Sequence, residues 1–136
     1  MKVGFTGSRK GLSKEQNAKL LKWMAENVKD VTDFHHGDCI GADSEAHNAL
    51  LFGRQFCKDH EVFIHIHPPL NQTLSARRNG DIVYPAKGYL ERNQDIVNAC
   101  DLLIAAPAGL EGDCLRSGTW ATVRIARKLK KKILIL

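Results

Sequence analysis

The stretch that decides the fold covers residues 101–136, DLLIAAPAGLEGDCLRSGTWATVRIARKLKKKILIL. It begins and ends with short runs of consecutive apolar residues, LLIAA and ILIL, a pattern typical of strands buried on both faces of a parallel sheet. Between these runs, residues 117–130 are expected to form a helix with one packing side and one basic side. A strand, a helix and a second strand in this order predict a unit of a parallel α/β sheet.

The same alternation of strands and helices extends through the rest of the chain. Apolar runs at 2–7, 33–38 and 62–69 are predicted to be strands, and segments 13–28, 43–54 and 89–99 are predicted to be helices. The first helix opens with SKEQ, in which Ser13 and Gln16 fit a capping box. Segment 68–88 is a long polar connection, and such loops in compact domains are usually functional or mobile. We therefore predict one α/β domain over residues 1–136, built on a doubly wound, parallel five-stranded sheet with helices on both faces.

The composition is ordinary for a folded protein, with a basic excess. Of the 136 residues, 43% are hydrophobic and 26% are charged, and the formal net charge of +5 favours anionic partners. No apolar run approaches the roughly 20 residues that a membrane-spanning helix needs, so no membrane partner is predicted. The opening MKVGFTGS lacks the apolar segment of a secretory signal peptide, and we expect a cytoplasmic protein.

The cysteines and histidines give no clear indication of a metal site. The four cysteines lack C-x-x-C spacing, which argues against a zinc site and a disulfide framework. Four histidines, at positions 35, 36, 65 and 67, fall within two predicted strands. Alternate residues of a strand point to one face but need not converge on an ion. We therefore predict no metal and no cofactor.

Polar and glycine-containing segments follow the predicted strands. They are TGSRKG at 6–11, HGDCIGAD at 36–43, HPP at 67–69 and PAGLEGDCLRSGT at 107–119. In open α/β sheets, ligands bind beyond the carboxyl ends of the strands, where the strand order reverses. The clustering of these segments predicts a binding site at that edge of the sheet.

The strongest local signal is RSGT at the start of the last helix. The unpaired N–H groups of a first helical turn and the helix dipole favour an anion. Ser117 and Thr119 add hydroxyl donors, Gly118 removes steric bulk, and Arg116 adds a forked cation. The alternative is that Ser117 only caps its helix.

Several other residues are candidates for the same site. After the first strand, Gly7 allows close approach of the backbone while Ser8 and Arg9 can donate to a phosphate, although a tight turn also favours glycine. Asp43 is either a helix cap or, with His47 four residues on, part of a pair suited to proton transfer or a ribose contact. The remaining candidates for ligand contact are Gly37, Asp38, Gly41, Arg92 and Asn93.

Four segments together resemble the SLOG superfamily of Rossmann-like proteins, which includes the Lonely Guy phosphoribohydrolases and the DNA-processing protein A family. In chain order they are GFTGSRKGL, HHGDCIGADSEAH, YLERNQDIVNACDLLIAAP and RSGTWATVRIARK. The resemblance covers nearly the whole chain and implies a Rossmann-like fold that binds nucleotides.

The Lonely Guy motif Pro-Gly-Gly-x-Gly-Thr-x-x-Glu is matched only in part. Pro107 corresponds to its proline and Gly118-Thr119 to its phosphate-binding Gly-Thr, but Thr122 occupies the position of its glutamate. The resemblance also implies that Arg92 belongs to the enzyme site, and Glu111 in the lengthened loop is a candidate to replace the missing carboxylate.

Three hypotheses about function follow. The first is binding of a nucleotide or nucleotide-derived phosphate ligand, as in a sensor, with Asp38 or Asp43 on the ribose. The long loop would add base or second-phosphate contacts through Arg77, Arg78 and Tyr84. The alternative is an N-glycosidase that cleaves a nucleoside 5′-monophosphate, with Glu111, Asp43 and Arg92 as catalytic residues. The third and least favoured is single-stranded nucleic-acid binding through a basic flank of the last helix at Arg124, Arg127, Lys128 and Lys131.

The resemblance also suggests a homo-oligomer. Trp23, Met24 and Trp120 are candidate apolar surface for its interface, while the alternative for Trp120 is packing between helix and sheet.

Overall fold

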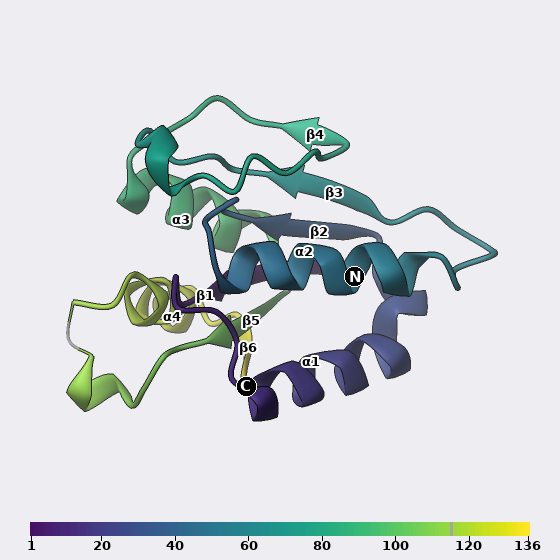
Figure 1. Cartoon of the computed structure of the whole chain (residues 1–136), viewed down its shortest axis with the longest axis horizontal. Helices are drawn as coiled ribbons and strands as arrows, with labels where there is room; N and C mark the ends of the chain where they lie inside the picture. Colours follow the sequence, from purple (N-terminus) through teal and green to yellow (C-terminus); the bar gives the residue numbers. More distant parts are fainter. Residues whose placement is uncertain (115) are drawn as a thin grey trace.

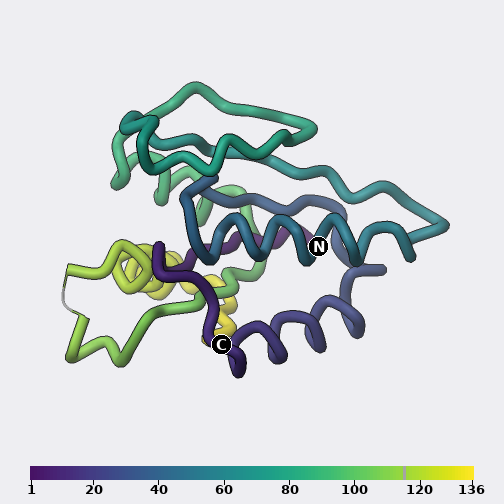
Figure 2. The backbone as a smooth tube through the Cα atoms, viewed as in Figure 1, coloured from purple at the N-terminus to yellow at the C-terminus, as the bar shows by residue number. Residues whose placement is uncertain are grey.

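The computed structural model describes residues 1–114 and 116–136, and its framework is a parallel sheet. The strands are β1 (Lys2–Gly7), β2 (Asp33–His36), β3 (Phe63–Ile66), β4 (Ile82–Val83), β5 (Leu102–Ala106) and β6 (Lys132–Ile135). They lie in the order β4-β3-β2-β1-β5-β6 and all neighbours are parallel (Figure 1). The chain moves outward from β1 to β4 and then returns to place β5 on the other side of β1 (Figure 2). Strand order therefore reverses beside β1.

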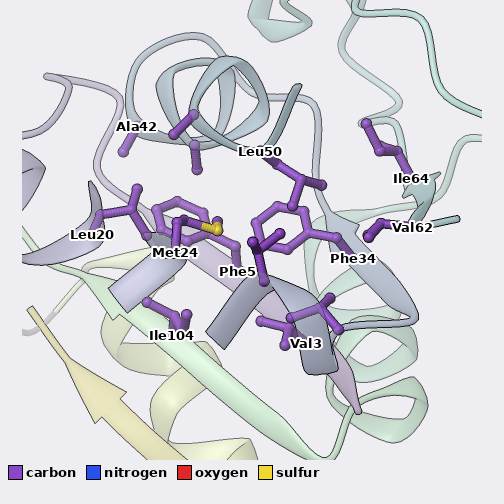
Figure 3. Packing of buried hydrophobic residues seen from close by; sticks show 14 of the residues in the cluster. Val3, Phe5, Leu20, Met24, Phe34, Ala42, Leu50, Val62, Ile64 and Ile104 are labelled. Atoms are coloured by element: carbon purple, nitrogen blue, oxygen red, sulfur yellow. The ribbon is translucent and has the colours of Figure 1, made fainter. Parts of the chain in front are cut away.

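Two pairs of helices cover the two faces of the sheet. Helices α1 (Lys14–Asn27) and α2 (Ala42–Arg54) share one core with Phe5 and Phe34, as Figure 3 shows from close by. Helices α3 (Tyr89–Ala99) and α4 (Gly118–Lys128) cover the other face, where Val97 and Trp120 pack with Leu103. Single turns of 3₁₀ helix occur at Val28–Asp30, Gln72–Leu74 and Glu111–Asp113. The doubly wound arrangement agrees with the prediction.

The predicted elements are present with small shifts at their ends. Ser13 and Gln16 form the predicted capping box of α1, and Ser117 caps α4 by accepting a hydrogen bond from the Trp120 amide. The sheet has six strands rather than five, because Ile82 and Val83 pair with β3. This strand is two residues long and exposed, so no buried apolar run marks it in the sequence.

The long connection at 68–88 is attached to the sheet by Asp38. The Asp38 carboxylate accepts hydrogen bonds from Ser75 Oγ at 2.5 Å and from the Arg78 amide at 2.9 Å, and its carbonyl accepts from the Ala76 amide. Arg78 also donates from Nε and Nη2 to Ser44 Oγ on α2. These contacts fix the course of the connection between β3 and α3.

Two of the three residues considered for an oligomer interface belong to the core of this chain. Met24 is 2% exposed and Trp120 is 6% exposed, so neither presents apolar surface to a partner. Trp120 packs between α4 and β5, as the alternative prediction has it, and its indole N–H donates to the Gly109 carbonyl. None of the helices in the described residues is long and apolar enough to cross a membrane.

Candidate functional site

A pocket of about 890 Å³ lies at the carboxyl ends of β1 and β2 and beside the start of α4. Its volume is within the usual range for small-molecule sites, and it lies beside the point where strand order reverses. Most of the predicted ligand-binding residues line it: Gly7, Ser8, Arg9, Gly37, Asp43, Arg92, Asn93, Arg116, Ser117, Gly118 and Thr119. Thus four segments that are distant in sequence meet at one cavity.

The first turn of α4 opens into this pocket. Ser117 Oγ caps the Trp120 amide, and among residues 1–114 and 116–136 the amides of Gly118 and Thr119 have no acceptor. Arg116 is exposed at the pocket wall, one residue before the cap. Free amides, the positive end of the helix dipole and a guanidinium together form an environment that stabilises an anion.

The turn after β1 forms the opposite wall. Ser8 donates from its amide to Ala106 on β5 and its carbonyl accepts from the Ala42 amide, so this turn is tied both to the sheet and to α2. A Cβ on Gly7 would collide with the Ala42 side chain, and Gly41 has a φ of +89° with the Arg9 carbonyl against it. The two glycines allow this close approach of β1 and α2, which places Ser8 and Arg9 at the pocket.

Asp43 and Arg92 form the buried floor of the pocket. Asp43 Oδ2 accepts from the amides of Gly37 and Cys39 at 3.1 and 3.3 Å, while its Oδ1 is buried with no hydrogen-bond partner among the described residues. Arg92 Nη1 donates to the Gly37 carbonyl at 2.8 Å, and the guanidinium lies over the Tyr89 ring. A buried polar atom without a partner is uncommon in folded proteins and indicates a place where a donor is expected.

Burial dominates the electrostatics of Asp43. Desolvation raises the pKa of Asp43 to about 6, although the Arg92 guanidinium and the two backbone amides act to lower it. Burial likewise raises the pKa of the neighbouring Cys39 thiol above its usual value. Asp43 therefore changes charge close to neutral pH, which is the range in which a proton donor or acceptor is useful.

Cations outnumber acids around the pocket. The described lining contains Arg9, Lys10, Arg92, Arg116 and Arg124 against Asp43 and Asp113. Converging positive charge raises the local concentration of anions and strengthens their binding. The positive charge at this edge of the sheet therefore favours an anionic ligand over a cationic one.

Three of the residues predicted for the site are not among the described residues that line the pocket. The Asp38 carboxylate holds the long connection, and Gly41 serves the turn before α2. Glu111 pairs with Arg127 at 2.8 Å and with Arg124 at 3.5 Å on the side of α4, outside the described pocket lining. Thr122, at the position of the missing glutamate, donates to the Gly118 carbonyl within its own helix.

The loop residues expected to contact a base also lie outside the described lining. Arg78 is bound to Ser44, and the Tyr84 hydroxyl pairs with His65 Nδ1 at 3.0 Å. Arg77 donates its amide to Ser75 Oγ and is absent from the described lining.

The pocket also contains residues that sequence reasoning did not assign to it. Cys39 lies between two of the predicted glycines, and Tyr89 lies three residues before Arg92, hence on the same side of α3. Arg124 was considered only as part of a basic flank, yet it reaches the pocket edge. The helical spacing from Arg92 is the signal that could have identified Tyr89.

Three of the four strand histidines, His35, His65 and His67, lie together on one face of the sheet, whereas His36 pairs with His47 of α2. His36 Nε2 lies 2.9 Å from His47 Nδ1 on the α2 side, whereas His35 stacks on His65 with ring centroids 4.1 Å apart on the other side. Burial lowers the pKa of His35 and His36 to about 3 and that of His67 to about 4. These rings are therefore neutral at physiological pH.

Fold and pocket together define an α/β protein with a cavity beside its topological switch point. No family model matches the sequence, and no curated protein matches it. Solved structures do match over nearly the whole chain. The molybdenum cofactor binding protein of the phototrophic bacterium Rippkaea orientalis is 18% identical, with a TM-score of 0.70 over 99% of this chain and 76% of that one.

Two further structures extend the comparison. The Moco carrier protein of Chlamydomonas reinhardtii is 20% identical, with a TM-score of 0.66 over 100% of this chain and 76% of that one. DNA processing protein A of Helicobacter pylori, described in a single-stranded DNA binding mode, is 18% identical, with a TM-score of 0.64 over 99% of this chain and 64% of that one. The chain shares the architecture of these proteins, which confirms the Rossmann-like fold that its motifs predict.

Proposed function

We propose that the chain binds a nucleotide or nucleotide-derived phosphate ligand in the pocket at the start of α4. The observation that carries this proposal concerns one cavity. Within residues 1–114 and 116–136, neither the amides of Gly118 and Thr119 nor the buried Asp43 Oδ1 at this cavity has a hydrogen-bond partner. The first feature favours an anion and the second favours a ligand with hydrogen-bond donors. A nucleotide carries both groups on one molecule.

The ligand's phosphate would lie against the amides of Gly118 and Thr119, with Arg116 and Arg9 as charged partners. Charge-assisted hydrogen bonds of this kind are the strong ones in phosphate recognition. A hydroxyl or N–H of the ligand would donate to Asp43 Oδ1, which relieves the cost of leaving that oxygen buried and unpaired. Arg92 holds the Gly37 carbonyl and keeps this floor in place.

Calorimetric titration with AMP, adenosine and inorganic phosphate tests the proposal. We expect AMP to bind at least tenfold more tightly than adenosine, since only AMP reaches both ends of the pocket. Lys19→Ala, an exposed change on α1 outside the described pocket lining, is the matched control and should bind as the wild type does. Equal affinity for AMP and adenosine would contradict a phosphate site.

The proteins of similar fold suggest one more ligand to test. Two of the similar structures are proteins named for binding or carrying the molybdenum cofactor. That cofactor is therefore included among the ligands tested, and mass spectrometry of the purified protein identifies any ligand that accompanies it. A co-purified ligand without phosphate would count against the proposal.

Hydrolysis is the second candidate function, and the raised pKa of Asp43 favours it. Cleavage of an N-glycosidic bond adds water across that bond and needs a group that moves a proton near neutral pH. With a pKa of about 6, Asp43 has this property and lies in the pocket. Release of free base from AMP, lost in Asp43→Asn, supports an enzyme, whereas binding without release supports a carrier or sensor.

Single-stranded nucleic acid is the less favoured ligand. It is supported by the fold shared with DNA processing protein A of Helicobacter pylori. Arg124 and Arg127 of the basic flank pair with Glu111, and Lys131 donates to the Cys100 carbonyl. Three of the four basic side chains of that flank therefore already have partners within the chain. Binding of an oligonucleotide that weakens steeply with salt and is unaffected by Arg116→Ala would favour it.

A further inference from the structure

A second polar cluster lies on the sheet away from the phosphate pocket. Asp33 and His35 of β2 and His65 of β3 share one face, because His35 and His65 are register partners and Asp33 is two residues before His35. None of the three is among the described residues that line the pocket. The cluster is therefore a separate feature of the fold.

The three side chains bring metal-ligating atoms close together. One ligand atom from each residue lies within 4.8 Å of the other two. His65 Nε2 is 2.8 Å from Asp33 Oδ1, and the rings of His35 and His65 stack with centroids 4.1 Å apart. Two imidazoles and one carboxylate form a ligand set that zinc and similar divalent ions accept.

The groups behind these side chains orient them as metal ligands are oriented. His65 Nδ1 pairs with the Tyr84 hydroxyl at 3.0 Å, so its other nitrogen faces Asp33. His35 Nδ1 pairs with His67 Nε2 at 3.0 Å, and among the described residues His35 Nε2 has no hydrogen-bond partner. In metal sites, the second nitrogen of a ligating histidine is almost always held by such a partner.

The cluster can also reach solvent. The side chain of Asp33 is 20% exposed, whereas that of His65 is 9% exposed. An ion can thus approach from the Asp33 side and remain in a mostly buried site. Tetrahedral zinc with metal–ligand distances of about 2.1 Å separates its ligand atoms by roughly 3.4 Å, so the Asp33–His65 pair needs to open by about half an ångström.

We propose that Asp33, His35 and His65 bind a divalent transition metal of the zinc class, with water in the remaining position. His67 and Tyr84 act on the ion only through the histidines they hold. The competing account is a hydrogen-bonded stack of rings that stabilises the pairing of β2 and β3 without any ion. The two accounts differ in metal content.

The test removes metal from the purified full chain with a chelator and titrates it with Zn²⁺, and separately with Co²⁺ to read the ligand-field spectrum. We expect one ion per chain and a Co²⁺ spectrum typical of four-coordinate nitrogen and oxygen ligands. Asp33→Asn and His35→Gln should each weaken Zn²⁺ binding at least tenfold. Asp59→Asn is the control, because it removes an exposed carboxylate that is not part of the cluster. This variant should bind Zn²⁺ as the wild type does.

Tyr84→Phe provides a variant that leaves all three ligands in place. Loss of the hydroxyl that holds His65 should weaken Zn²⁺ binding about tenfold, the usual effect of removing such a partner. Absence of stoichiometric binding to the wild type would overturn the proposal. Binding that is unchanged in both Asp33→Asn and His35→Gln would overturn it as well.

Discussion

The pocket at the start of α4 and the cluster of Asp33, His35 and His65 both bury polar side chains, but the hydrogen-bond partners of these side chains differ. In the cluster, His65 pairs with Asp33 and Tyr84, and His35 pairs with His67. In the pocket, Asp43 Oδ1 has no partner among the described residues, and the first amides of α4 have none either. A buried polar atom without a partner costs stability, so Asp43 Oδ1 indicates a place where a ligand is expected to donate a hydrogen bond.

The two regions also differ in charge. Burial lowers the pKa of His35, His36 and His67, so these three rings are neutral at pH 7. The described lining of the pocket instead contains four guanidinium groups and one lysine against the carboxylates of Asp43 and Asp113. Neutral imidazoles can bind a cation, whereas converging guanidinium groups favour an anion. The following substitutions in the pocket test its half of this contrast.

Arg92→Ala should have the largest effect. It removes the buried cation beside Asp43 and the hydrogen bond to the Gly37 carbonyl, which leaves an uncompensated carboxylate. Breaking a buried charge arrangement in this way typically costs about 3–5 kcal/mol of unfolding free energy. Urea unfolding at pH 7 measures the loss, and AMP binding should fall below detection.

The same variant should recover part of its stability in mild acid, since protonation of Asp43 removes the uncompensated charge. Arg9→Ala, an exposed guanidinium of the same pocket, is the control and should leave stability close to that of the wild type. A loss of stability for Arg92→Ala that is identical at pH 7 and pH 5 would show that Asp43 is not the group affected.

Asp43 should make the unfolding free energy depend on pH. Its carboxyl holds a proton more tightly in the folded chain, with a pKa of about 6, than in the unfolded chain, where 3.8 applies. The wild type therefore loses stability as pH rises from about 4 through 6, by about 3 kcal/mol in total, and no more above that range. The buried histidines act in the opposite direction, so the difference between the wild type and Asp43→Asn at each pH isolates this contribution.

The pH dependence of ligand affinity provides a second test of the Asp43 carboxylate. If a hydroxyl of AMP donates to Asp43 Oδ1, affinity should be highest above pH 6 and should fall as the carboxylate is protonated. Affinity that does not change between pH 5 and pH 8 would contradict the contact with Asp43.

Arg116→Ala should change the pocket without changing the fold. The side chain is exposed beside the start of α4, so removing it leaves the unfolding free energy close to that of the wild type. AMP affinity should fall by roughly 1.5–3 kcal/mol, the scale of a charge-assisted hydrogen bond, while adenosine affinity should stay the same. A similar loss for both ligands would mean that Arg116 does not face the phosphate.

Much of this arrangement follows from local sequence, because its causes are local. The periodicity of apolar residues predicts the four helices and five of the strands, and the Ser13 capping box predicts where α1 begins. The rule that ligands bind beyond strand ends then collects Ser8, Asp43 and the RSGT segment into one region, which is where the pocket lies.

Other features of the fold and the site depend on contacts between residues that are distant in sequence, which no local pattern predicts. Strand β4 is two exposed residues whose pairing is set by β3, and Asp38 is bound by a loop residue 37 positions away in sequence. The approach of His35 to His65 likewise depends on the register of two strands rather than on the residues within either one. Polar residues at strand ends are therefore identifiable from sequence, but their partners are not.

Glu111→Gln should have the smallest effect, and this makes it a sharp test of the catalytic hypothesis drawn from the family resemblance. Glu111 forms exposed ion pairs with Arg127 and Arg124, and such pairs contribute little to stability. We expect AMP affinity to be unchanged and the melting temperature to shift only slightly. If the protein releases base from AMP and Glu111→Gln abolishes that release while Asp43→Asn does not, then the loop carboxylate reaches the ligand during turnover and replaces the missing glutamate. The opposite pattern assigns the proton transfer to the buried floor of the pocket, where Asp43 lies.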